Sequence, residues 1–208
     1  KQKNFQVSRK FYPWKVKFYI MITALDKNTA LVLIDLQNGI VNLPLAHPIG
    51  SVLENAAKLV AAFRKAGLPV VVVNVNPKDS PLNPLRKDAK SPATAFDENW
   101  LKITSEIQIT KEDILITKNT WNAFTNPALN EELKKRNVTG IVLAGVSTSI
   151  GIEGTARAAS ENGYNITFAK DAMTDMFAEA HAHSLKYIFP RLGEVDDTKK
   201  IIEKLNEA

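Results

Sequence analysis

Asp35, Lys118 and the small-residue turn Gly145–Gly151 each directly follow a short run of apolar and β-branched residues. Such runs are typical of buried strands in a parallel sheet. The carboxyl ends of parallel strands lie along one edge of the sheet, and open α/β sheets bind their ligands there. We therefore expect a carboxylate, an ammonium group and a tight turn to meet in one site, although they lie far apart in the chain.

The chemistry of these groups is complementary. In a partly buried cleft, Asp35 and Lys118 stay ionised as a pair or determine which of them carries the proton. A turn that leads into a helix presents backbone amides to an anion, and its small side chains let a carboxylate or a developing oxyanion approach closely. Each feature also has a structural interpretation: Asp35 as a turn or cap residue, Lys118 as a solvated lysine, and the turn as tight strand–helix packing.

The wider pattern predicts an α/β fold, a doubly wound, mainly parallel sheet of five to six strands with helices on both faces. The five expected strands are Ala30–Ile34, Val70–Val73, Ile114–Thr117, Ile141–Ala144 and Ile166–Ala169. The expected helices are Ser51–Ala66 with Ser51 as its cap, Ala128–Arg136 after the cap Asn126 and Pro127, a helix from Thr148 or Ser149 to Gly163, Ala178–Phe189 and Asp197–Asn206. The proline-rich segment Asn76–Gln108 lacks periodicity and is predicted to be a functional loop or lid.

Composition excludes several classes of protein. The 208 residues contain no cysteine, which excludes disulfides, thiolate metal ligands and a cysteine nucleophile. The formal charge is +5, but residues 1–20 hold six basic and no acidic residues, so the remainder is nearly neutral and does not indicate a nucleic-acid surface. No apolar run approaches the length of a membrane helix. We expect a cytoplasmic protein that acts on a small molecule.

The first 20 residues interleave basic and aromatic side chains, and Met21 has the features of a natural start. We interpret residues 1–20 as a non-native leader and residues 21–208 as one domain. The alternative is an aromatic and basic arm that packs on a partner subunit.

Four ordered blocks of sequence carry a resemblance to a known family. They are Leu31–Gly39, Ile116–Phe124, Gly145–Arg157, and Gly163-Tyr164 together with Asp171–Met173. In these blocks the chain resembles the isochorismatase-like (cysteine hydrolase) superfamily. The resemblance implies a six-stranded parallel sheet with a short last strand near Gly193–Val195, a cis peptide bond before Ser147, and a homo-oligomer, either a dimer or a tetramer.

Two departures from the family pattern bear on the chemistry. The nucleophilic cysteine of the amidase members is matched here by Gly151, and isochorismatases proper also work without it. The Asp-x-His metal element of nicotinamidases is matched by Asn74-Val75-Asn76, and His47, His181 and His183 are not spaced as a metal set. We therefore expect no metal and no cofactor.

The resemblance implies a hydrolase whose substrate is of the isochorismate type, a vinyl ether that Asp35 protonates as a general acid. The alternative is an amidase relative without its nucleophile, either a natural binding protein or a variant engineered from cysteine to glycine. A serine nucleophile at Ser147 or Ser149 is less favoured, because no histidine matches a catalytic position to act as its base. The predicted catalytic residues are Asp35, Lys118 and Gly151, and the predicted substrate-binding residues are Gln37, Trp121, Phe124, Val146, Ser147 and Ser149.

Overall fold

The computed structural model describes residues 21–78, 80–81 and 96–207. The proposed leader, residues 1–20, lies outside the described residues, as does most of the proline-rich half of the expected loop. In the described part, six strands form one sheet in the order β3-β2-β1-β4-β5-β6, and every pair is parallel. The strands are β1 (Thr29–Ile34), β2 (Val70–Val75), β3 (Ile114–Lys118), β4 (Gly140–Val146), β5 (Asn165–Thr174) and β6 (Glu194–Asp196).

Helical elements connect these strands. The α-helices are α1 (Asn38–Val41), α2 (Ile49–Lys65), α3 (Glu98–Leu101), α4 (Pro127–Lys135), α5 (Glu153–Glu161), α6 (Ala178–His183) and α7 (Thr198–Leu205). Four other helical turns lie in the described residues: the 3-10 helix η1 (Ala123–Thr125), the π-helical turns η2 (Thr148–Ile152) and η3 (Ser184–Ile188), and the 3-10 helix η4 (Phe189–Arg191). The predicted α/β sheet of five to six strands is confirmed.

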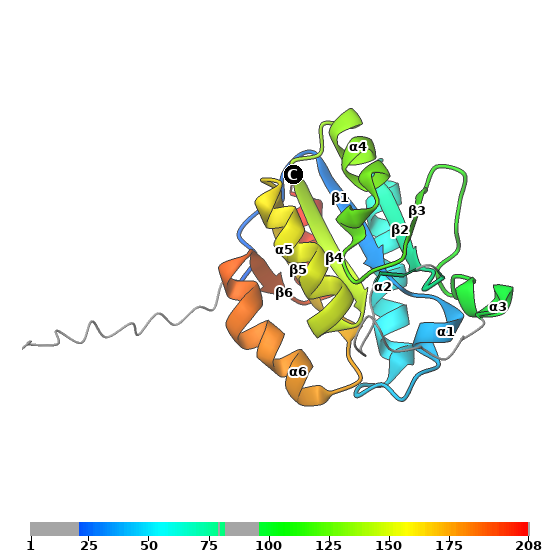
Figure 1. Cartoon of the computed structure of the whole chain (residues 1–208). Coiled ribbons are helices and arrows are strands. Elements are labelled where there is room, and N and C mark those ends of the chain that lie inside the picture. Colours follow the sequence, from blue (N-terminus) through cyan, green and yellow to red (C-terminus); the bar gives the residue numbers. More distant parts are fainter. Residues whose placement is uncertain (1–20, 79, 82–95, 208) are drawn as a thin grey trace, which may run out of the picture.

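Two hydrophobic clusters cover the two faces of the sheet. Because successive side chains of a strand point to opposite faces, Val32 and Ile34 of β1 join one cluster and Leu31 and Leu33 join the other. The first cluster includes buried residues of α4 and α5, and the second includes those of α2 and α7. Figure 1 shows α4 and α5 in front of the sheet and α2 behind it.

Of the helix caps predicted from the sequence, one is confirmed and two are wrong. Asn126 does cap α4, since its side chain accepts a hydrogen bond from the backbone of Ala128. Helix α2 begins at Ile49, with Pro48 and not Ser51 at its cap position. Neither Thr148 nor Ser149 caps the helix after β4, because both lie inside the π-helical turn η2 that precedes α5.

The segment Asn76–Gln108 is less irregular than its composition predicts, as far as the structure describes it. Its described part contains the single-turn helix α3, which Asp97 caps by accepting from the backbone of Trp100 at 2.7 Å. Ile103 then forms an antiparallel bridge with Gln37. This part of the segment therefore packs beside the carboxyl end of β1.

Candidate active site

Asp35 and Lys118 form a buried ion pair at the carboxyl edge of the sheet. The Lys118 Nζ lies 2.7 Å from Asp35 Oδ2, and both side chains are almost fully buried. The same ammonium group donates to the backbone carbonyl of Thr120 at 3.1 Å. Of its three N–H donors, two thus have partners among the described residues.

The sheet order explains why the partner of Asp35 has a long side chain. Strand β3 lies two strands away from β1, a separation of about 10 Å, so only a long side chain at its end reaches Asp35. Asp35 itself follows β1 with a φ of 52°, a left-handed conformation that aspartate adopts more readily than most residues. Its backbone N–H donates to the carbonyl of Val73 at 2.9 Å and so fixes the start of the turn.

Burial raises the pKa of Asp35 to about 6, while the charge of Lys118 and its hydrogen bond act in the opposite direction. The second carboxyl oxygen, Oδ1, is buried and has no hydrogen-bond partner in the described part of the chain. An oxygen in this position carries a proton at low cost, because the protonated carboxyl group is the form that burial favours. Asp35 is therefore a buried carboxyl group that can hold a proton up to about pH 6.

The turn after β4 lies against this carboxylate. A Cβ atom built on Gly151 would lie 3.3 Å from Asp35 Oδ2, 3.0 Å from the side chain of Ile34 and 3.4 Å from the carbonyl oxygen of Val146. These contacts are close, so any side chain at position 151 would require its neighbours to shift by a few tenths of an ångström. A side chain at position 151 would thus contact Asp35 in a place with very little spare volume.

The side chain of Asp175, the residue that follows β5, holds the start of the turn. The Val146–Ser147 peptide bond is cis, and the carbonyl of Ser147 accepts hydrogen bonds from Ile150 and Ile152. The backbone and hydroxyl of Ser149 both donate to Asp175 Oδ2, at 2.7 and 2.9 Å. The Ser149 hydroxyl is thus bound to a carboxylate oxygen.

The remaining predicted binding residues differ in their surroundings. Val146 is fully buried at the end of β4. Gln37 is buried too, and its amide pairs with backbone groups: Oε1 accepts from Val75 at 2.7 Å, and Nε2 donates to Val75 and Trp100 carbonyls. This pairing gives Gln37 a structural role at the carboxyl end of β2, and its contact with substrate stays a prediction.

The two predicted aromatic wall residues are not equivalent. Trp121 is 56% exposed and its backbone lies near Gly154 at the start of α5. Phe124 packs against the hydrophobic cluster of α4 and α5, with its ring centroid 5.8 Å from that of Tyr164. The structure therefore brings Asp35, Lys118 and Gly151 together, and it packs Phe124, a residue of η1, against the first hydrophobic cluster.

Sequence reasoning missed a histidine–threonine network beside the turn. The His181 ring bonds through Nδ1 to the Thr148 hydroxyl at 2.8 Å, and that hydroxyl donates to the carbonyl of Thr174 at 3.0 Å. His47 bonds to the Thr174 hydroxyl at 2.9 Å, and the two imidazole centroids lie 4.5 Å apart. His47 and His181 are 134 positions apart, and no local pattern pairs them.

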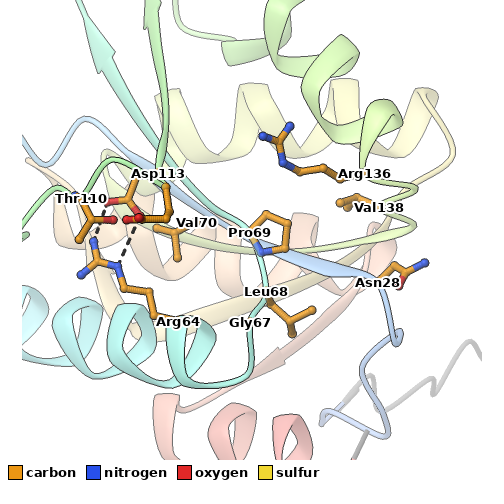
Figure 2. A pocket seen from close by; sticks show the side chains of 11 residues that line it. Asn28, Arg64, Gly67, Leu68, Pro69, Val70, Thr110, Asp113, Arg136 and Val138 are labelled. Atoms are coloured by element: carbon orange, nitrogen blue, oxygen red, sulfur yellow. Dashed lines mark hydrogen bonds and ion pairs between the residues drawn. The ribbon is translucent and has the colours of Figure 1, made fainter.

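Two hollows of the described surface lie at opposite ends of the sheet. One, of about 390 Å³, lies at the carboxyl end of β3, where Lys118 is among its lining residues. The other, of about 720 Å³, lies at the amino ends of β2 and β3 and is shown in Figure 2. There Arg64 turns toward Asp113 and pairs with it at 2.6 Å, while Arg136 pairs with Glu132, so both cations of this hollow are already neutralised.

No group of three or more His, Asp or Glu residues within the described ranges is arranged to hold a metal ion. No helix in the described part of the chain is both long enough and apolar enough to cross a membrane.

Comparison with known proteins places the chain in a family. The isochorismatase domain matches residues 29–200. The chain belongs to the isochorismatase family. It is 41% identical over 184 residues to the isochorismatase family protein YecD of Escherichia coli O157:H7, with 86% of this chain and 97% of that one covered. It is also similar to the structure of an isochorismatase family protein from Burkholderia thailandensis, with a TM-score of 0.82, 36% identity, and coverage of 89% of this chain and 99% of that one.

Family membership identifies this protein as an isochorismatase-family hydrolase. Further relatives are named for different activities: Nicotinamidase 3 of Arabidopsis thaliana at 31% identity, the isochorismatase of Bacillus subtilis at 28%, and a ureidoacrylate amidohydrolase of Acinetobacter baylyi at 26%. They cover 77%, 88% and 85% of this chain, and 80%, 60% and 83% of their own lengths. Family membership thus supports hydrolysis, and the kind of bond that is hydrolysed has to be inferred from the site.

Proposed function

We propose that this isochorismatase-family hydrolase cleaves a vinyl ether of the isochorismate type by general-acid catalysis, with no metal and no covalent intermediate. The observation that carries the proposal is Asp35, a buried carboxyl group whose pKa is raised to about 6 and whose Oδ1 lacks a partner. The chain has no cysteine, so an amidase mechanism through a thiolate is not available to it.

In the proposed reaction, Asp35 transfers its proton to the terminal carbon of the enol ether. The C=C electrons form the new C–H bond, and the ether oxygen stabilises the resulting oxocarbenium ion. Water then adds to the oxocarbenium carbon and loses a proton to the Asp35 carboxylate. The hemiketal collapses to a 2-oxo acid and an alcohol, so that the proton balance closes on Asp35.

Lys118 has two functions in this scheme. Its charge keeps the pKa of Asp35 from rising further, and its remaining N–H donor binds a carboxylate of the substrate. The lack of a side chain at Gly151 spares Asp35 Oδ2 a further contact at 3.3 Å. The exposed indole of Trp121 is proposed to contact the substrate at the mouth of the site.

The test is release of a 2-oxo acid from isochorismate, measured beside a panel of small primary amides and ureido compounds. Vinyl ether cleavage without amide cleavage supports the proposal. Amide cleavage by the native chain, with isochorismate left intact, refutes it.

One observation favours a second candidate, an amidase relative that lacks its nucleophile. A Cβ at position 151 would contact both Asp35 Oδ2 and the turn, the place where a nucleophile would need its base. For this candidate, Gly151→Cys would create amidase activity that the native chain lacks. For the vinyl ether hydrolase, the same substitution adds bulk and no useful group.

A further inference from the structure

Thr155 links the two segments that hold the candidate catalytic residues. It lies in the first turn of α5 and is fully buried. Its hydroxyl donates to the carbonyl of Gly151 at 2.7 Å and accepts from the backbone N–H of Ala123 at 3.1 Å. The first bond is local, one helical turn back, whereas the second joins α5 to the segment that follows β3.

The contact around Thr155 is close. The neighbouring Gly154 has no side chain, and a Cβ built there would lie 3.7–3.8 Å from backbone and Cβ atoms of Trp121 and Asn122. The segment after β3 therefore rests directly on the start of α5, and the Thr155 hydroxyl forms a polar link within that contact. Ala123, which supplies the N–H, is itself fully buried.

These bonds close a ring of contacts around the site. Lys118 bonds to Asp35 and to the carbonyl of Thr120, in the segment that Thr155 holds through Ala123. At its other end Thr155 holds Gly151, which lies against Asp35. A displacement of the post-β3 segment from α5 would thus move Thr120, and with it Lys118, relative to Asp35.

We propose that Thr155 is a positioning residue that fixes the segment after β3 against the Gly151 turn and thereby holds Lys118 on Asp35. The catalytic role of Thr155 rests on the proposed function. The coupling between Lys118 and Asp35 that Thr155 maintains does not require a bound substrate. Loss of the hydroxyl leaves a buried N–H and a buried C=O without this partner, and both groups then favour rearrangement toward water.

The test is a double-mutant cycle read out by the titration of Asp35. Carboxyl ¹³C NMR follows its pKa, with the resonance assigned by its loss in Asp35→Asn. Lys118→Met raises the pKa of Asp35 in the native background, because Lys118 is the group that lowers it. In a Thr155→Val background, which keeps the shape and removes both hydrogen bonds, we expect this rise to be at least halved.

Two matched variants complete the design. Thr155→Ser keeps the hydroxyl and should restore the full effect of Lys118→Met. Thr29→Val removes a hydroxyl that is equally buried and bonds to the carbonyl of Asp26 at 2.6 Å, but at the amino end of β1. It should leave the effect at its native size.

An equal rise in the native and Thr155→Val backgrounds would overturn the proposal. If the valine variant does not fold, Thr155→Ala, which also removes both hydrogen bonds, takes its place. Failure of both to fold, with a folded serine variant, would assign Thr155 a purely structural role and also contradict the proposal. Since no turnover is measured, this outcome is independent of whether the vinyl ether is the substrate.

Discussion

Replacement of Asp35 by asparagine tests the acid that the proposed mechanism requires. Asparagine has nearly the same shape, accepts a hydrogen bond from Lys118, and tolerates the left-handed φ of 52° at this position. The substitution therefore removes the titrating proton and keeps the local geometry. General acid–base groups contribute about 10²–10⁴-fold to rate, so kcat should fall by at least about 100-fold while KM changes little.

The dependence of kcat/KM on pH tests the same acid independently. With a pKa of about 6, the carboxyl group is protonated in roughly nine-tenths of molecules at pH 5 and in about one-tenth at pH 7. The acid is the protonated form, so kcat/KM for 2-oxo acid release should fall as pH rises through 6. Above that value it should fall about tenfold per pH unit.

The matched control is Asp113→Asn. Asp113 is also a buried carboxylate in an ion pair, with Arg64, but it lies at the amino edge of the sheet. It should lower stability and leave kcat unchanged. Full turnover by Asp35→Asn, or a native kcat/KM that does not change between pH 5 and 8, would refute acid catalysis by Asp35.

Three other expectations follow from the surroundings of Gly151, His181 and Asn126. Gly151→Cys should lower the free energy of unfolding by about 1–3 kcal/mol, because its Cβ would lie 3.0 Å from Ile34. The same substitution should not raise vinyl ether turnover. Unchanged stability in urea unfolding would contradict the expected loss. Burial, then the nearby His47, lowers the pKa of His181, so the folded state binds fewer protons than the unfolded state and stability should decline as pH falls below about 6.5. The raised pKa of Asp35 changes stability with pH in the opposite direction, so the free energy of unfolding is compared between the native protein and His181→Gln across this pH range. An equal pH dependence of stability in the two proteins would refute the contribution of His181. Asn126→Ala should cost about 1 kcal/mol in thermal or urea unfolding, since its side chain caps α4, and a neutral result would show that the cap is replaced by water.

Sequence patterns alone determined the scaffold and the edge of the sheet at which the site lies. Continuous apolar runs predicted the strands because burial on both faces of a parallel sheet requires such runs. Parallel order then placed Asp35 and Lys118 at one edge, where the structure pairs them at 2.7 Å. The Asn126 cap was equally readable, since a cap followed by proline at the first helical position is a local signal.

Tertiary structure decided what each polar side chain at that edge binds. Thr148 and Ser149 were predicted as helix caps, but their hydroxyls bond to groups on β5, α6 and the residue after β5, which lie 26 or more positions away. Gln37 is likewise occupied by the backbone of β2, and Thr155 by that of Ala123. A hydroxyl or amide group has several possible hydrogen-bond partners, and the local sequence indicates only those that are nearby in the chain. The choice among distant partners is made by packing, because a buried polar group must find whichever partner the fold brings within reach.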